Sequence, residues 1–270
     1  MQRQYLAFID ILGFSKFVDG IPKRLGGSPS EEQIQTAIEY FYENFTSFIE
    51  GAICRYGIKE ITIDSRTYST SDFSNVSINS LQISDSLLLW TDDTKIEALI
   101  HLLTVVKEIF YNSYIAYGFP LRGTISSGII SHIETRYSTN KYNNKYQILG
   151  KPLIEAVGIE KNQDWSGCVI AKSTINTLSD EALKVLILNK LIIKYIVPYK
   201  SNINEHCDYA LNWVSCFSNI DKSFCEQLTN NVIKKFEEIS FFNGEKISDS
   251  VTTKLNNTCA FIKHCLNLNS

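Results

Sequence analysis

The sequence predicts an α+β fold, with a mixed domain over residues 1–215 and a helical extension over residues 216–270 that packs on the same unit. Residues 5–9 form an apolar run that ends at a carboxylate, a pattern typical of a buried strand. Residues 80–90 predict a hairpin, because two apolar stretches flank a short polar bend. From Phe224 onward the apolar residues recur at helical spacing, so the extension is expected to consist of two helices.

Apolar periodicity, caps and helix breakers define the other expected elements. Apolar positions three or four residues apart from Ser30 to Ala52 predict one long amphipathic helix. The stretch 58–80 is polar and rich in Ser and Thr, which favours a loop with at most a short strand. Further helices are expected at 16–21, from 94 to about 117, and at 151–161, 179–190, 224–241 and 248–266, strands at 121–130, 168–171, 191–197 and 209–214, and a polar loop at 136–144.

Composition narrows the functional class and the cellular compartment. A net charge of −3 argues against a dedicated nucleic-acid binder. The apolar run 185–193 is broken by Asn189 and Lys190, so no membrane span is expected, and a charge at position 10 argues against an export signal. We therefore expect a cytoplasmic protein. The seven cysteines show no metal-binding pair, which favours reduced thiols but leaves open a zinc site near His206 or His264.

Asp10 is the first candidate functional residue. A buried charge is costly unless it is paired or holds a metal, and Asp10 stands at the end of an apolar strand. The Gly13-Phe14-Ser15 turn then leads toward a helix, whose free N–H groups suit phosphate. This stretch fits a metal–triphosphate site and fits equally well an Asp that caps the next helix.

Four motifs in order resemble those of class III nucleotide cyclases. Phe8-Ile-Asp-Ile-Leu-Gly-Phe-Ser15 is similar to their first metal motif, and Ser84-Asp85 lies where their second metal aspartate sits on a hairpin. Arg122-Gly-Thr-Ile-Ser-Ser-Gly128 resembles their glycine-containing strand, and Gly150 with Ala156 resembles their following helix. The resemblance covers about residues 5–175. It implies a ferredoxin-like core, in which helices pack on one face of a sheet dominated by antiparallel strands.

Departures from the family pattern point to one branch of it. Leu81 and Gln147 occupy the positions that read the purine in adenylate and guanylate cyclases, and Ile154 and Gly158 replace the transition-state Asn and Arg. This combination resembles the bacterial pyrimidine (uridylate or cytidylate) cyclases of Pycsar anti-phage signalling systems. The resemblance implies conversion of UTP or CTP to cyclic UMP or cyclic CMP and diphosphate, as a second messenger for antiviral defence that activates a separate effector protein.

The resemblance also implies roles for individual residues. Two Mn²⁺ or Mg²⁺ ions per site would be held by Asp10, Asp85 and the carbonyl of Ile11, a set of hard oxygen ligands. The backbone amides of the 13–15 turn would bind the β- and γ-phosphates. Leu81 and Gln147 would meet the base.

The transition state needs a positive charge that Gly158 cannot supply. Arg122, Lys151 and Lys161 are the candidates, and the sequence does not rank them. A structural or dimer salt bridge for Arg122 and a solvated helix face for both lysines remain alternatives.

The family forms composite sites, in which one protomer supplies the metals and the other supplies the base and transition-state contacts. We therefore expect a homodimer, formed around the strand 122–128 and its neighbouring loops. Two other functions remain open: a cyclase-like domain that binds a nucleotide or partner without catalysis, and an atypical purine cyclase. The sequence does not distinguish UTP from CTP, and it indicates neither the effector, the trigger of activity nor the role of the C-terminal helices.

Overall fold

The computed structural model describes residues 2–54, 58–63, 66–71, 78–117, 119–136, 144–200, 207–216, 222–241 and 248–267. Its strands are β1 (Arg3–Ile11), β2 (Ile58–Ile63), β3 (Arg66–Ser71), β4 (Ile78–Ile83), β5 (Ser86–Thr91), β6 (Leu121–Ile129), β7 (Ser131–Arg136), β8 (Asn144–Leu149), β9 (Cys168–Ile170), β10 (Ile192–Lys194) and β11 (Tyr209–Leu211). The α-helices are α1 (Phe14–Leu25), α2 (Glu31–Cys54), α3 (Ile96–Asn112), α4 (Lys151–Asn162), α5 (Lys172–Ile175), α6 (Asp180–Leu188), α7 (Lys222–Phe241) and α8 (Asp249–Asn267). A π-helical turn, η2 (Ser113–Tyr117), follows α3, and a 3₁₀ turn, η3 (Trp213–Cys216), follows β11.

A seven-stranded sheet in the order β10-β11-β9-β6-β1-β5-β4 forms the centre of the structure. Strand β1 pairs antiparallel with both β5 and β6, whereas β6 and β9 are parallel. The four strands β6-β1-β5-β4, with the helices that connect them, follow the β-α-β-β-α-β plan of the ferredoxin-like fold. The predicted α+β class with a mostly antiparallel sheet is therefore confirmed.

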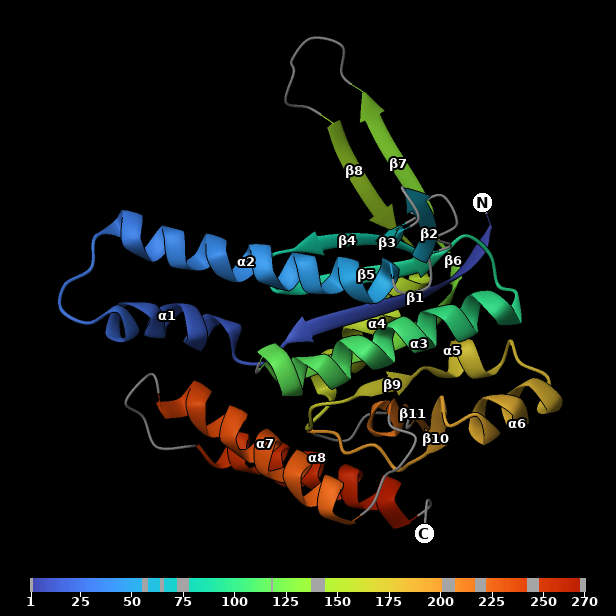
Figure 1. Ribbon diagram of the computed structural model, residues 1–270. Helices are drawn as coiled ribbons and strands as arrows, with labels where there is room; N and C mark the ends of the chain where they lie inside the picture. The colour runs from blue at the N-terminus through green and yellow to red at the C-terminus, as the bar shows by residue number, and fades with distance from the viewer. Residues whose placement is uncertain are drawn as a thin grey trace.

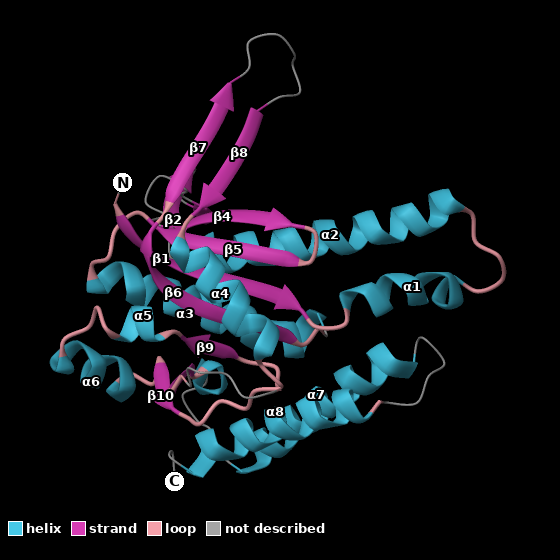
Figure 2. Cartoon of the chain, turned by 180° about the vertical axis from the view of Figure 1, so that it is seen from behind, coloured by secondary structure: helices cyan, strands magenta, loops and turns pink. Residues whose placement is uncertain are grey.

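Helices cover both faces of this sheet. Because successive side chains of a strand point to opposite faces, Tyr5, Ala7 and Ile9 lie in the large core, whereas Leu6 and Phe8 pack in a second cluster. Figures 1 and 2 show α2 and α3 on one face and α4 on the other. The expectation that helices pack on one face was thus wrong. An apolar strand with two buried faces requires cover on both of them.

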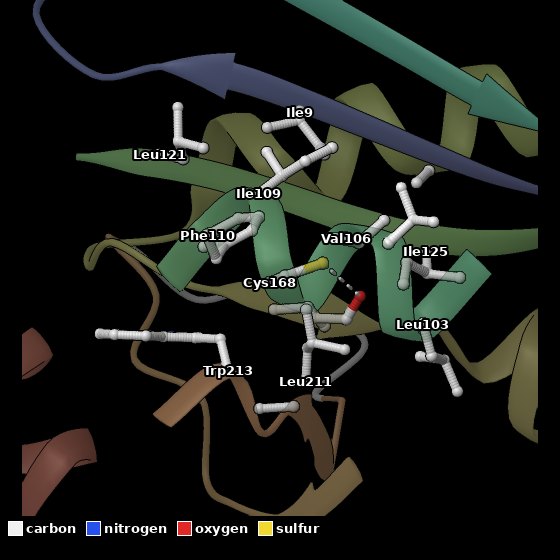
Figure 3. Close-up of a cluster of buried hydrophobic side chains, with 14 of the residues drawn as sticks. Ile9, Leu103, Val106, Ile109, Phe110, Leu121, Ile125, Cys168, Leu211 and Trp213 are labelled. Atoms are coloured by element: carbon white, nitrogen blue, oxygen red, sulfur yellow. Dashed lines mark hydrogen bonds between the residues drawn. The ribbon is translucent and has the colours of Figure 1, made fainter. Parts of the chain in front are cut away.

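Helix α3 fills the main core. Figure 3 shows its side chains, including Val106, Ile109 and Phe110, directed toward Ile9 of β1 and Ile125 of β6. These residues are at most 1% exposed. The dense packing fixes the position of β1, and therefore of Asp10 near its end.

The C-terminal helices α7 and α8 lie side by side along one side of the molecule (Figure 1). Phe261 and Ile262 of α8 are fully buried and belong to the same core as Trp165 and Trp213. Helix α7 contacts α1 and η2. The helical extension is therefore built into the core that also supports the sheet.

Two local expectations need correction, and a third lies largely outside the described residues. The 58–80 stretch contains β2 and β3, which pair as a separate hairpin, because Ser and Thr side chains do not prevent strand pairing. Helix α1 is longer than expected and includes Pro22.

Strands β7 and β8 form an arm that projects beyond the sheet (Figure 2). Residues 137–143, the centre of the expected polar loop, lie outside the described residues. None of the described helices is both long and apolar enough to cross a membrane.

Candidate functional site

Strand register places three polar side chains in one row across the sheet. Asp10 of β1 stands opposite Ser86 of β5 on one side and opposite Arg122 of β6 on the other. Residues directly opposite each other in antiparallel strands share a face and lie close together. The Ser86 hydroxyl donates a hydrogen bond to Oδ1 of Asp10 over 3.0 Å. The row continues the strand face that carries Leu6 and Phe8, so it lies on the side covered by α4.

Asp85 joins this row through the β4–β5 turn. Ser84 adopts φ 53°, in the left-handed region, which gives the two-residue turn its tight bend. The backbone N–H of Ile11 then donates to the carbonyl of Asp85 over 3.2 Å. The hairpin bend is thereby attached to the end of β1, and the two aspartates come from neighbouring strand ends, as the sequence predicted for a hairpin at 80–90.

The environment of Asp10 disfavours its charge. Burial raises the pKa of Asp10 to about 6, and the carboxylates of Glu160 and Asp85 act in the same direction. The Ser86 hydrogen bond and the more weakly felt Arg122 guanidinium lower this pKa, but they do not compensate. A carboxylate held near other carboxylates is stabilised in its charged form by a bound cation.

The donor set fits a hard divalent cation. Asp10 and Asp85 offer carboxylate oxygens, the ligands that Mg²⁺ and Mn²⁺ prefer. Over the described ranges, no group of three or more His, Cys, Asp or Glu side chains could hold a metal ion. Further ligands at this site would therefore be backbone oxygens or phosphate oxygens of a substrate. The zinc alternative involving His206 lies outside the described residues, and Cys259, Cys265 and His264 form no such group.

The Gly13–Ser15 turn begins α1 close to Asp10. Gly13 is the N-cap, with φ 79°, and because it is a glycine it has no side chain to cap the first N–H groups of α1. The Phe14 ring packs against Phe41 and Tyr42, with ring centroids 5.5 and 5.8 Å apart, so this side chain belongs to the core. Phe14 can therefore offer a phosphate only its backbone N–H. Ser15 is exposed, so its side chain is accessible as well.

Arg122 is buried and already has two partners. Its Nε is paired with the carboxylate of Glu160, and its Nη1 donates to the carbonyl of Gln163 over 3.3 Å. These bonds use two of the five guanidinium N–H groups. The structure therefore places Arg122 next to Asp10, as the transition-state hypothesis needs, and also in the salt bridge that was its alternative.

Sequence reasoning missed Glu160. It is 2% exposed, and burial raises its pKa more than the Arg122 charge lowers it. Pro152, Ala156 and Glu160 are the buried residues of α4, each four positions from the next. A carboxylate on the buried stripe of an amphipathic helix is the signal that could have identified it.

The two candidate lysines lie at opposite ends of α4. Lys151 begins the helix between Gly150, which lies close to Ile129, and Pro152, and Ile129 pairs with Arg3 at the far end of β1 from Asp10. Lys161 lies next to Glu160, and its carbonyl accepts a hydrogen bond from Nζ of Lys200 over 2.5 Å. Both lysines are exposed. Within one chain, the structure brings the end of α4 that carries Lys161 toward Asp10, but not Lys151.

Of the two positions expected to meet the base, only Leu81 lies on the α4 side of the sheet. Leu81 of β4 packs against the second cluster, which also contains Ile148 of β8. Gln147, next to Ile148, is exposed. On α4, Ile154 is 75% exposed, and a Cβ at Gly158 would meet open space. Lys151, Ile154, Gly158 and Lys161 therefore form one solvent-facing stripe, called the open face of α4 below.

Comparison with known proteins finds similarity in structure but not in sequence. No protein-family model and no curated protein matches the sequence. An adenylate cyclase of Trypanosoma brucei, solved in its monomeric state, aligns with TM-score 0.47 and 14% identity, over 81% of this chain and 93% of that one. A bacterial light-regulated adenylyl cyclase aligns with TM-score 0.43 and 11% identity, over 87% and 98% of the two chains. Similarity of this degree does not by itself identify a reaction.

Proposed function

We propose that this protein is a nucleotide cyclase that converts UTP or CTP to the 3′,5′-cyclic monophosphate and diphosphate. The observation that carries the proposal is the placement of Asp10 and Asp85 at one end of the sheet, beside the N-terminus of α1. A carboxylate with a raised pKa gains its charge when a divalent cation binds, and a helix N-terminus suits the triphosphate that comes with it.

The chemistry follows from this arrangement. Asp10 and Asp85 would hold Mn²⁺ or Mg²⁺, and the N–H groups of the 13–15 turn would hold the β- and γ-phosphates. When bound, such ions would supply positive charge that lowers the pKa of the ribose 3′-hydroxyl and offsets the charge of the triphosphate. The 3′-hydroxyl would lose its proton to solvent and its oxygen would attack the α-phosphorus, while the bond from the α-phosphorus to the β-phosphate oxygen breaks and diphosphate leaves. Arg122 would stabilise the charge that develops on the α-phosphate, with Glu160 fixing the direction of its guanidinium.

The proposed catalytic unit comprises residues 1–215. Its product would be a second messenger for antiviral defence that acts on a separate effector protein in the cytoplasm.

One experiment tests the reaction. The protein is incubated with Mn²⁺ and each of the four labelled nucleoside triphosphates, and the products are separated. Cyclic UMP or cyclic CMP is the expected product. Cyclisation of ATP or GTP would indicate an atypical purine cyclase instead.

A non-catalytic nucleotide-binding domain is the second candidate. It is favoured by the open face of α4, where Ile154 and Gly158 offer no polar side chain to a transition state. Binding of a nucleoside triphosphate with Mn²⁺, without product from any of the four, would support this candidate.

We predict that the protein is a homodimer in solution. The strand 122–128 itself is not free to form the expected interface, because β6 pairs with β1 and β9 within the sheet and its residues from Leu121 to Gly128 are buried. The open face of α4 is the better candidate, since Lys151 can serve a site only in a partner chain. Light scattering should give twice the mass of one chain. Ile154→Asp places a charge on the open face of α4, so it should shift the measured mass toward that of the monomer. An active monomer at nanomolar concentration would contradict this prediction.

Base choice gives a second prediction. Leu81 is half-buried and apolar, so Leu81→Lys should place a charge beside the base and reduce pyrimidine turnover by about 2–4 kcal/mol of transition-state stabilisation. Gln147→Ala should relax base selection more than it weakens metal binding, because a Gln amide can donate to O4 of uracil or accept from N4 of cytosine. Steady-state rates on UTP, CTP, ATP and GTP provide the measurement. Unchanged preference in both variants would mean that other residues read the base.

A further inference from the structure

The segment 163–167, called the bridge below, connects the C-terminal helix α8 to the start of β6. It directly follows α4, and Gln163, Trp165 and Ser166 within it are fully buried. Buried polar groups that lose a hydrogen-bond partner pay a desolvation penalty, so a fully bonded buried segment resists displacement. The bridge is therefore suited to transmit the position of α8 to the sheet.

On one side the bridge holds the strand on both sides of Arg122. The Ser166 hydroxyl donates to the carbonyl of Leu121 over 2.5 Å, and the Gly123 N–H donates to the carbonyl of Gly167 over 2.9 Å. Nε2 of Gln163 donates to the carbonyl of Gly123 over 2.8 Å. Arg122 itself donates to the carbonyl of Gln163. The residue opposite Asp10 is thus fixed by the bridge through its own side chain and through both neighbours.

On the other side the bridge is held by α8. The Ser166 N–H donates to Oγ1 of Thr258 over 2.9 Å, and Nδ2 of Asn257 donates to the carbonyl of Asp164 over 2.7 Å. The ring of Trp165 packs against Phe261, with centroids 4.8 Å apart. Thr258 and Phe261 are fully buried. This contact combines apolar packing with directed hydrogen bonds. Together they fix both the position of the bridge along α8 and the distance between the bridge and the helix.

We propose that α8 is a positioning element of the active site, which holds Arg122 opposite Asp10 by means of Thr258, Asn257 and the bridge. The proposal rests on the proposed cyclase function. It gives the C-terminal extension a catalytic role, because an Arg side chain displaced by about 1 Å can lose a hundredfold in rate. Thr258 and Asn257 act through Arg122 and touch no reacting atom.

Among the described residues, the hydrogen bonds that hold Asp10 and Asp85 do not involve the bridge. Asp10 receives its hydrogen bond from Ser86, and Asp85 is attached to β1 through the N–H of Ile11. Loosening α8 should therefore impair the chemical step and leave metal binding intact. A general loss of structure would affect both.

The test uses the full-length chain and the variant Thr258→Val, which keeps the shape of the side chain and removes the acceptor for Ser166. Thr253→Val is the matched control, because the Thr253 hydroxyl lies on the exposed part of α8 and donates to the carbonyl of Asp249. Thr258→Ser restores the hydroxyl. The measurements are kcat and KM for UTP and CTP, the Kd for Mn²⁺, and hydrogen exchange at the amides of Ser166 and Gly123.

We expect Thr258→Val to lower kcat about tenfold or more, with KM and the Kd for Mn²⁺ changed less than twofold. Exchange at Gly123 should accelerate together with exchange at Ser166. Thr253→Val should match the wild type, and Thr258→Ser should recover most of kcat. An unchanged kcat, or an equal loss in Mn²⁺ affinity, would overturn the positioning role.

Failure of the cyclase function would be recognised separately. A wild-type protein without turnover refutes the proposed function, and hydrogen exchange then decides whether the connection exists. Faster exchange at Gly123 in Thr258→Val supports transmission from α8 to β6. Faster exchange confined to Ser166 refutes it.

Discussion

Asp10→Asn and Asp85→Asn are each expected to reduce cyclisation by on the order of a thousandfold or more. The metals supply several kcal/mol of transition-state stabilisation, and each substitution removes one of the two carboxylates that would hold them. Turnover of the preferred pyrimidine triphosphate and Mn²⁺ titration provide the measurements. Asp92→Asn is the matched control, since Asp92 is an exposed aspartate at the other end of β5. Wild-type turnover in both variants would contradict the metal site.

Asp10→Asn should not lower the stability of the fold. An acid whose pKa is raised on folding destabilises the native state above that pKa and has no such effect below its unfolded value. The pKa of Asp10 is about 6 in the folded protein, against an ordinary value of 3.8. The loss of folding stability caused by its charge is therefore fully present above about pH 6 and disappears toward pH 4. It amounts to at most about 3 kcal/mol. Asp10→Asn should therefore melt at a higher temperature than the wild type at pH 8 in EDTA. The difference should vanish near pH 4 and shrink when Mn²⁺ is added to the wild type. A variant that melts lower at pH 8 would refute this account of Asp10.

Glu160→Gln is expected to cause the largest loss of stability, about 3–5 kcal/mol. The substitution leaves the buried Arg122 guanidinium without its counter-charge, and breaking one side of a buried ion pair costs more than the pair contributed. Denaturant unfolding provides the measurement. Glu155→Gln on the same helix is the control, because Glu155 is only half-buried.

The double variant Arg122→Met/Glu160→Leu separates stability from activity. Replacing both charges by apolar side chains of similar size should recover most of the unfolding free energy. It should not recover turnover, because the positive charge opposite Asp10 is lost. A double variant with full activity would exclude Arg122 from the chemistry.

Local patterns were enough to predict the two strand ends that carry Asp10 and Asp85. The apolar run before Asp10 and the polar bend at Asp85 each define a strand end without reference to the rest of the chain. The sequence could not show that Glu160 pairs with Arg122, because that contact depends on how α4 lies across β6. The periodicity of α4 marks Glu160 as buried but does not indicate its partner.

The sequence also did not predict that α4 covers the second face of the sheet. Leu6 and Phe8 show that β1 is apolar on both faces, but the expected helix after Gly150 carries only a weak apolar stripe. Likewise, Thr258 and Asn257 are ordinary polar residues of an amphipathic helix. Their importance comes from the buried bridge that they meet, which only the folded structure brings next to them.

The central position of β1 has a consequence for how the chain folds. This strand is synthesised before both of its neighbours, because its register partners include Ser86 and Arg122, which emerge from the ribosome much later. Non-local pairing of this kind slows folding, and an unpaired apolar strand invites aggregation during the delay. Synthesis must therefore pass the end of β6 at Ile129 before the strand that carries Asp10 has both neighbours. Chaperone occupancy on nascent chains should be highest in that interval.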